Sequence, residues 1–319
     1  MGVVLAALLG AALAIGLVLY IGLDGVLRSL EVVGWSGFVL VCLAQIALFP
    51  LLGSAWAVLT PSPPIRWRAM VIGRVLRDAA TEVLPFSAVG GFIIGARAAI
   101  LAGASAPVVF ATATADLAME FAAQIAYVTL GLSLLAFSGP ALADVVSAAP
   151  LVLGLAVALV CAVGFVLAQR FALRPLIEQI AKRTPLSFLV NADAFHDVIS
   201  AIYRRPVQLG LSIGLHLLGW IASAAGAWLA LRFLGHEINP VSLIELECLL
   251  YAVRSAAFFV PAGLGVQEGA YAILGPIFGV PMEIALALSL LKRARDLTIG
   301  IVALAGLQMV ETRRAFAAP

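Results

Sequence analysis

Long apolar segments make up most of this chain of 319 residues. A helix that crosses a bilayer needs about 20 predominantly apolar residues. Six segments reach this length, and they cover residues 3–23, 37–60, 107–136, 148–169, 207–232 and 282–311. The first has no basic residues ahead of it and is too long for the apolar part of a signal peptide, so we interpret it as a retained span. The pattern therefore predicts an all-α, polytopic membrane helical bundle.

Two further apolar regions, 68–103 and 241–280, are interrupted by charged residues, proline and glycine. Each region is too long for one span and short for two. We expect each to form a broken helical hairpin that enters the membrane without crossing it, which gives six full spans and two re-entrant hairpins. If both hairpins cross fully, the chain has up to ten crossings and the topology of the other spans is unchanged.

The distribution of basic residues sets the orientation of the spans, because cytoplasmic loops carry an excess of Lys and Arg. The segment 170–206 contains six basic residues and is therefore expected on the cytoplasmic side. Counting spans outward from it places the basic 61–68 linker and the C-terminal tail on the same side. The opposite connections hold a single basic residue, Arg28, and comprise residues 24–35, 137–147 and 233–240. Both termini are thus predicted to be cytoplasmic.

Part of the segment 170–206 carries apolar residues at helical spacing. These residues are Phe188, Ala192, Phe195, Ile199 and Ile202. The spacing predicts a short amphipathic helix with one apolar face. Two placements are open: the helix lies on the cytoplasmic leaflet, or it packs under the bundle.

The two interrupted regions share a sequence pattern. The first reads RVLRDAATEVLPFSAVGGFIIGAR and the second reads VRSAAFFVPAGLGVQEG. The order helix, helix, hairpin, helix then occurs twice within a single membrane domain, in residues 1–140 and 141–319. With the orientation above, the first hairpin enters from the cytoplasm and the second from outside, so the halves are predicted to be inverted repeats. Inverted repeats with paired broken helices are typical of secondary transporters, in which the breaks mark the substrate site.

Composition excludes several classes of protein. Hydrophobic residues make up 63% of the chain and charged residues 11%, and the mean hydropathy is +1.13. This excludes an ordinary soluble enzyme and a disordered chain, and the uninterrupted apolar segments exclude an outer-membrane barrel. The net charge of +2 gives no reason to expect a nucleic-acid partner. The cysteines show no CxxC spacing and are expected to be buried; they are Cys42, Cys161 and Cys248.

Ionisable residues inside the apolar segments are the candidates for function. Such a side chain at membrane depth costs at least ~2.5–3.5 kcal/mol and is therefore usually paired or faces a cavity. With the prolines and glycines of the breaks, the residues expected to bind or transport substrate are Arg77, Glu82, Pro85, Gly90, Gly91, Arg97, Asp116, Glu120, Arg254, Pro261, Gly263, Gly265, Glu268, Arg293 and Asp296. No nucleophile motif or metal-ligand spacing occurs, so we expect no catalytic activity, cofactor or metal.

The motif VPAGLGVQEG has the composition of a broken helix. Pro261 lacks an amide hydrogen, and Gly263 and Gly265 allow turns closed to other residues. A helix that restarts after the break presents N–H groups and a partial positive charge that suit a phosphate, and Arg254 adds a bidentate contact. Glu268 is expected to take an ammonium head group, exchange a proton or pair with Arg254. The alternative is a tight turn in which Glu268 caps its own helix.

The first hairpin carries a matching polar stripe. Arg74, Asp78 and Glu82 follow one another at one-turn spacing, with Arg77 on the same face. This stripe either lines a cavity or belongs to an interfacial helix that lies flat with its charges in water. Glu82, the closest of the four to the break at Pro85, is the preferred candidate.

Asp116 and Glu120 lie four residues apart on one face of a long apolar helix, where like charges repel. Either basic residues neutralise them, with Arg97, Arg254 and Arg293 as candidates, or one carboxyl is protonated. The alternative to a functional role is structural ion pairing.

The last apolar segment contains four charges within five residues, which is too dense for packing alone. They are Lys292, Arg293, Arg295 and Asp296. His216 stands alone in its own apolar segment, and we expect it to be a hydrogen-bond partner between helices rather than a ligand.

The charged LP(x)4GG hairpin near residue 85, the motif VPAGLGVQEG and the charged last helix together resemble the lysylphosphatidylglycerol synthase transmembrane-region family. This family includes the flippase half of the bacterial multiple peptide resistance factor and many stand-alone proteins. The resemblance covers nearly the whole chain, but VPAGLGVQEG alone is specific to the family. It implies a bacterial inner-membrane location and a role for Pro261, Gly263, Gly265 and Glu268. A looser resemblance is to stand-alone membrane proteins associated with hopanoid biosynthesis.

The resemblance also limits the expected activity. The large lysyl-transferring members carry an additional cytoplasmic acyltransferase-like domain, whereas this sequence stops at Pro319. We therefore expect no aminoacylation of lipid.

These observations favour a flippase-like transporter of a phospholipid or a lipid-like anionic substrate of hopanoid or polyprenyl type, with coupling to protons or ions. Two alternatives are an ion-coupled transporter of a small polar solute and a non-transporting assembly factor for membrane lipid (hopanoid) biosynthesis. The oligomeric state is open, a homodimer included.

Overall fold

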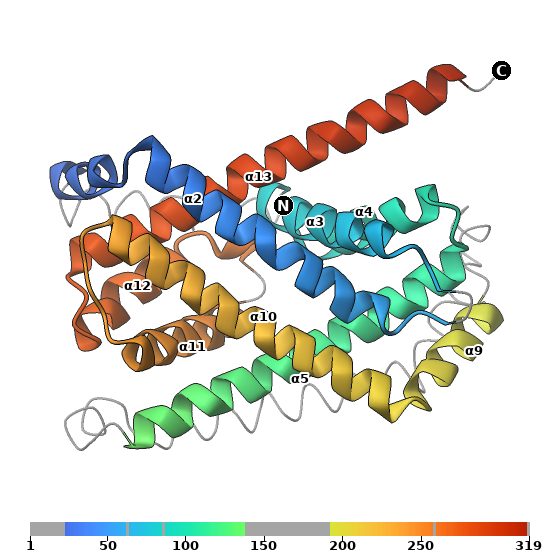
Figure 1. The fold of residues 1–319 in the computed structure, drawn as a ribbon, viewed down its shortest axis with the longest axis horizontal. Helices are drawn as coiled ribbons and strands as arrows, with labels where there is room; N and C mark the ends of the chain where they lie inside the picture. Colours follow the sequence, from blue (N-terminus) through green and yellow to red (C-terminus); the bar gives the residue numbers. More distant parts are fainter. Residues whose placement is uncertain (1–22, 62–63, 85–86, 138–191, 258–259, 318–319) are drawn as a thin grey trace. The chain divides into compact units, whose positions relative to one another are not determined.

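The computed structural model describes residues 23–61, 64–84, 87–137, 192–257 and 260–317 (Figure 1). Every regular element in these ranges is a helix. The long helices are α2 (Leu23–Ala57), α5 (Ala106–Phe137), α10 (Pro206–Phe233) and α13 (Met282–Ala317). The shorter ones are α3 (Trp67–Val83), α4 (Ser87–Leu101), α9 (Ala192–Tyr203), α11 (Pro240–Ala256), η2 (Pro261–Gly263) and α12 (Val266–Ile277). The prediction of an all-α fold is confirmed.

Within the described ranges, three helices are long and apolar enough to cross a membrane. They are Leu30–Ala57 in α2, Ala106–Leu135 in α5 and Pro206–Phe233 in α10, close to the predicted spans 37–60, 107–136 and 207–232. The predicted span 282–311 is one continuous helix, α13, but charged residues near its start, middle and end leave it outside this group. The predicted spans 3–23 and 148–169 lie outside the described residues. The number of spans and the side of the termini stay predictions.

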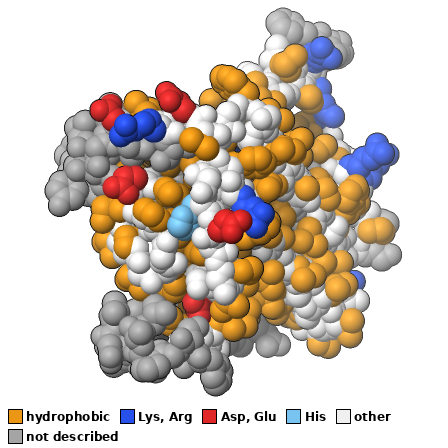
Figure 2. All heavy atoms as spheres, turned by 60° about the vertical axis from the view of Figure 1, so that its left-hand side comes forward, with side chains coloured by type: hydrophobic (Ala, Val, Ile, Leu, Met, Phe, Trp, Pro, Cys, Tyr) orange, Lys and Arg blue, Asp and Glu red, His pale blue; other side chains and the backbone are white. Residues whose placement is uncertain are grey.

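The helices expose many large apolar side chains. On α2, Val39 and Leu43 are more than half exposed, and so are Ile301 and Val302 on α13. On the face drawn in Figure 2, hydrophobic side chains predominate and charged side chains appear in a few separate places. Apolar surface of this extent is unfavourable in water at about 25 cal/mol per Å² but costs nothing against lipid tails. The surface is typical of helices that contact lipid.

The first interrupted region is a helical hairpin, as predicted. α3 ends at Val83 and α4 begins at Ser87, and the chain turns back between them. A Cβ added to Gly91 would lie 2.7 Å from the backbone oxygen of Arg77 and 2.2 Å from the hydroxyl of Thr81. The two helices therefore touch backbone to backbone, which only glycine permits at this place. Pro85, expected at the break, lies outside the described residues.

The second interrupted region is also a broken pair of helices. α11 starts at Pro240, where the Asn239 side chain accepts a hydrogen bond of 2.8 Å from the amide of Val241; this is a common N-terminal signal. The chain leaves α11 after Ala256 and passes through the short turn η2 before α12 begins. α12 packs against both α11 and α13. The break predicted at Pro261 is thus present.

Contacts divide the chain into two compact units. Unit 1 comprises residues 1–48, 75–93 and 222–319, and unit 2 comprises residues 49–74 and 94–221. Unit 1 contains α11, α12, α13 and the break of the first hairpin. Unit 2 contains α5 and α9. The predicted repeats, residues 1–140 and 141–319, stay a prediction.

The apolar core of unit 2 joins α9 to α5. Its buried members are Leu59, Ala111, Ala115, Ala118, Met119, Phe195, Ile199 and Ile202. The apolar stripe of the predicted amphipathic helix thus faces protein. Of the two placements left open by the sequence, α9 adopts packing against a neighbouring helix; Phe188 lies outside the described residues.

Candidate functional site

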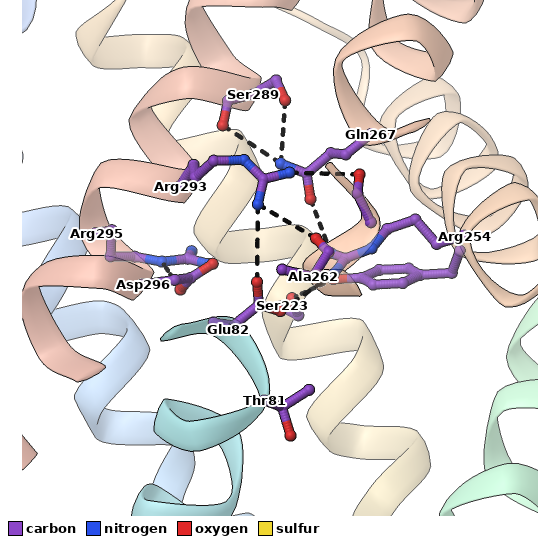
Figure 3. Close-up of polar contacts among 12 residues, drawn as sticks. Thr81, Glu82, Ser223, Arg254, Ala262, Gln267, Ser289, Arg293, Arg295 and Asp296 are labelled. Atoms are coloured by element: carbon purple, nitrogen blue, oxygen red, sulfur yellow. Dashed lines mark hydrogen bonds and ion pairs between the residues drawn. The ribbon is translucent and has the colours of Figure 1, made fainter. Parts of the chain in front are cut away.

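In unit 1, charged side chains from both hairpins and from α13 lie in one connected group. We call it the hairpin network; its members are Glu82, Arg254, Gln267, Glu268, Ser289 and Arg293. Figure 3 shows Arg254 of α11 and Arg293 of α13 pointing toward Glu82 at the end of α3. The network therefore joins four helices: α3 of the first hairpin, α11 and α12 of the second, and α13.

The ion pair between Glu82 and Arg254 connects the two hairpins. Nη2 of Arg254 donates to Oε1 of Glu82 over 3.1 Å, and Nη1 donates to the side-chain oxygen of Gln267 over 2.8 Å. The Arg254 side chain is 23% exposed and that of Glu82 is 21% exposed. Both side chains of this pair are therefore only partly buried.

Glu268 is the buried carboxylate of the network. Its side chain is fully buried; Oε1 accepts a hydrogen bond of 2.7 Å from Nε of Arg293, and Oε2 accepts one of 2.8 Å from the amide of Gly265. Gly265 has a φ of 75°, a left-handed conformation that glycine adopts without strain, and α12 begins directly after it. Glu268 thus caps its own helix, as in the alternative stated above. The expected pairing of Glu268 with Arg254 is wrong, because Arg293 is its partner.

The capping by Glu268 also changes the expected phosphate site. We expected the restarted helix to offer free N–H groups to an anion, but the amide of Gly265 is bonded to this carboxylate. A carboxylate at a helix N-terminus is favourable for the same electrostatic reason as a phosphate. The cationic groups that remain partly exposed in the network are the guanidinium groups of Arg254 and Arg293.

Arg293 holds the break of the second hairpin. Its Nη1 donates to the backbone oxygen of Ala262 over 3.2 Å, and its Nη2 lies 3.5 Å from that of Gly263. Nη1 is also 3.9 Å from Oε2 of Glu82. One guanidinium group therefore satisfies carbonyl oxygens that the broken helix leaves unpaired and contributes positive charge beside Glu82.

Two polar members of the network were not expected from the sequence. The side-chain nitrogen of Gln267 donates to two atoms of Ser289, the hydroxyl over 3.0 Å and the backbone oxygen over 3.3 Å. The sequence contains a feature that could have indicated each of them. Gln267 belongs to the motif VPAGLGVQEG, and Ser289 precedes Arg293 by one turn on the same face of α13.

A second buried cluster in unit 1 was also missed. Nζ of Lys292 donates over 2.8 Å to both Glu247 and the hydroxyl of Tyr271, and that hydroxyl donates to Glu247. The rings of Tyr251 and Tyr271 lie 5.7 Å and 5.3 Å from the ammonium nitrogen. Lys292 was noted as part of a charge cluster, but Glu247 lies in an apolar segment and its partners are on other helices.

Asp116 and Glu120 belong to unit 2 and are paired separately. Asp116 accepts a hydrogen bond from His216 at 2.9 Å, and Arg74 donates to Glu120 over 2.6 Å. Neutralisation by a basic partner is thus present at Glu120, and His216 is a hydrogen-bond partner between helices, as predicted. Of the proposed partners, Arg254 and Arg293 are wrong, because both contact carboxylates of the hairpin network.

The remaining candidates are placed outside these groups. Arg77 is buried, with Nε 3.8 Å from Asp78 on the same helix. Arg97 is exposed on α4. Asp296 forms a two-point contact with its neighbour Arg295, at 2.8 Å and 3.1 Å. Gly90 faces only Leu84, in contrast to the tightly packed Gly91.

The comparison with known proteins identifies the family of the chain. The family model described as the lysylphosphatidylglycerol synthase TM region matches residues 5–305. No curated protein and no solved structure is significantly similar to the chain. The matched region includes the three long apolar helices, both hairpins and every residue of the hairpin network. The chain is therefore a membrane protein that belongs to the lysylphosphatidylglycerol synthase transmembrane-region family.

Proposed function

We propose that this protein is a flippase-like transporter that moves a phospholipid or a lipid-like anionic substrate across the bacterial inner membrane. The observation that carries the proposal is the partly exposed ion pair between Glu82 and Arg254, which joins the ends of the two hairpins beside Arg293. The substrate phosphate binds to the two arginines in place of Glu82.

The environments of the two carboxylates support this exchange. Glu268 is fully buried and held by Arg293 and by the amide of Gly265, so it stays in place. Glu82 is partly exposed and bonded at 3.1 Å to Arg254 alone, with Arg293 more distant at 3.9 Å. The phosphodiester of a phospholipid offers two non-bridging acceptor oxygens to the two guanidinium groups and forms charge-assisted hydrogen bonds with them. It therefore competes best with Glu82.

Displacement of Glu82 has a mechanical consequence. Glu82 belongs to the first hairpin and Arg254 to the second, so their ion pair holds the hairpins together when no substrate is bound. A phosphate on Arg254 breaks that connection. A ligand shifts a conformational equilibrium by its differential affinity for the two states, and here the phosphate favours the state with separated hairpins. The two states provide the alternation that transport requires.

A lipid is favoured over a small polar solute for two reasons. The described helices expose large apolar side chains, which allows an acyl chain to stay in the membrane while the head group reaches the arginines. The family is also named for the membrane region of synthases of a phospholipid. Both alternatives, a solute transporter and an assembly factor, predict different outcomes in the following experiment.

The test is movement of labelled phosphatidylglycerol between leaflets of proteoliposomes. We expect the wild-type protein to accelerate it and the double variant Glu268→Gln, Arg254→Ala to slow it by about tenfold or more, since charged hydrogen bonds contribute about 1.5–3 kcal/mol each. Glu237→Gln, which neutralises an exposed carboxylate of the same unit, is the control. Equal rates in wild type and double variant contradict the mechanism. Uptake of glycerol phosphate without lipid movement indicates a solute transporter, and neither activity indicates an assembly factor.

A further inference from the structure

The hydrogen-bonded pair Asp116 and His216 lies in the interior of unit 2. Nε2 of His216 and Oδ1 of Asp116 are 2.9 Å apart, and both side chains are fully buried. Each residue is the eleventh of a helix that is long and apolar enough to cross a membrane. At 1.5 Å per residue, each lies about 15 Å from its helix start. The pair therefore lies about a third of the way along each helix rather than at a helix end.

One ring nitrogen of His216 is left open. Nδ1 is buried and has no hydrogen-bond partner among the described residues, and the same holds for the hydroxyl of Ser212, one turn earlier on α10. Buried polar groups are nearly always hydrogen-bonded, and a histidine with a purely structural role normally uses both nitrogens. Two open polar atoms on one face of α10 therefore mark a place for a ligand.

The geometry defines what this ligand is. An ionised carboxylate only accepts hydrogen bonds, so Nε2 of His216 carries the hydrogen that points to Asp116. The neutral ring then has a free lone pair on Nδ1. A proton added there leaves the existing contact intact and converts it to a charge-assisted hydrogen bond, while the net charge of the pair changes from −1 to 0.

We propose that Asp116 and His216 form a proton-binding site, in which Nδ1 of His216 takes up and releases the proton. With the transport function proposed above, on which this step rests, proton binding at this site provides the coupling to a proton gradient.

Several described groups around the Asp116–His216 pair are engaged in contacts of their own. Along α5, Glu120 is bonded at 2.6 Å to Arg74 of α3, and this ion pair has no net charge. Thr112, one turn before Asp116, accepts from the ring nitrogen of Trp56 of α2 at 3.2 Å. Along α10, Trp220 stacks on Tyr127 of α5. The face of α9 toward α5 is apolar. In the part of the chain that the structure describes, Arg74 and Glu120 are thus charged groups on α3 and α5 close to the pair.

Titration of His216 tests the site without any transport measurement. The chain has three histidines, so a variant with His196→Asn and His236→Asn leaves His216 as the single signal in ¹⁵N NMR of the protein in lipid nanodiscs. We expect the imidazole signal to show one protonation step, with its midpoint at lower pH in Asp116→Asn than in wild type because the carboxylate no longer stabilises the imidazolium. This variant is nearly isosteric and keeps a polar partner for Nε2. A flat signal from pH 5 to 9, or an unchanged midpoint in Asp116→Asn, overturns the proposal.

A transport measurement distinguishes the proposed proton coupling from the proposed lipid transport. We expect a proton gradient to change the rate of lipid movement several-fold in wild-type proteoliposomes. In His216→Gln, we expect the rates with and without the gradient to be equal. A gradient effect that persists in His216→Gln overturns the coupling role. An equal rate of lipid movement in wild type and in the double variant Glu268→Gln, Arg254→Ala contradicts the proposed function. In that case the NMR titration still tests the proton site by itself.

Discussion

The same residue types perform different tasks in this protein according to exposure. Glu82 and Glu268 both face arginine, but the first is partly exposed with an ion pair of 3.1 Å and the second is buried between Arg293 and a backbone amide. An exposed ion pair exchanges partners easily, whereas a buried one is costly to break. We therefore assign the exchange to Glu82 and the support of the helix break to Glu268.

Glu82→Gln tests the exchange directly. Removal of the competing carboxylate leaves Arg254 available, so we expect the affinity for an anionic lipid to rise by about 10- to 100-fold, the equivalent of one charged hydrogen bond. Binding of fluorescent phosphatidylglycerol to the detergent-purified protein measures this. Asp78→Asn, one turn earlier on α3 and beside Arg77, is the matched control and should leave the affinity as in wild type. A weaker affinity in Glu82→Gln would show that Glu82 belongs to the binding site itself.

Glu268→Gln tests the supporting role. The substitution leaves the charge of Arg293 without its buried partner, and such a loss costs about 3–5 kcal/mol. Thermal unfolding of the purified protein should show a clear decrease in Tm. Glu237→Gln breaks the exposed pair with Arg232, whose side chains are 83% and 51% exposed, and should change stability by less than about 1 kcal/mol. Similar effects of the two substitutions would mean that Glu268 is not a supporting residue.

At the scale of helices, the sequence shows where each hairpin breaks but not which side chains meet there. Proline and glycine mark the breaks because they act on their own backbone. Spacing within a helix likewise predicts neighbours such as Asp116 and Glu120. Glu82 and Arg254, in contrast, are 172 residues apart, and their contact depends on how separate helices pack. For the same reason, the sequence suggested the wrong partner for Glu268.

Two adjacent glycines of α4 provide a test of the first hairpin. A Cβ on Gly91 would meet the backbone oxygen of Arg77 at 2.7 Å, whereas a Cβ on Gly90 has its nearest atom, in Leu84, at 3.9 Å. We expect Gly91→Ala to force the two helices apart at a cost of about 1–3 kcal/mol. Gly90→Ala should be neutral or stabilising by up to about 1 kcal/mol, as for glycine replacement inside a helix. Thermal unfolding of both variants decides this, and equal stabilities would contradict the close approach of α3 and α4.

At the scale of the whole molecule, charge inside the apolar segments is arranged mainly as ion pairs. Unit 1 contains the hairpin network and the Lys292–Glu247 pair, and unit 2 contains the Arg74–Glu120 pair. Pairing lowers the cost of placing ions at membrane depth. The Asp116–His216 pair differs, because its charge depends on whether a proton is bound. The exchange proposed at Glu82 and the proton binding proposed at this pair are the two elements on which the proposed coupled transport depends.

Inverted orientation of the two hairpins is the requirement on which transport by this molecule depends. Arg68 lies in the first turn of α3, where the first hairpin begins, and is exposed; Glu237 precedes the second hairpin and is also exposed. If the halves are inverted, the chain enters the first hairpin from the cytoplasm and the second from outside. In a protein with its three cysteines replaced by alanine, we expect Arg68→Cys to react with an impermeant maleimide only in inside-out vesicles and Glu237→Cys only in intact cells. Labelling of both cysteines from the same side of the membrane would show that the halves are parallel. The hairpins could not then alternate access to a shared phosphate site.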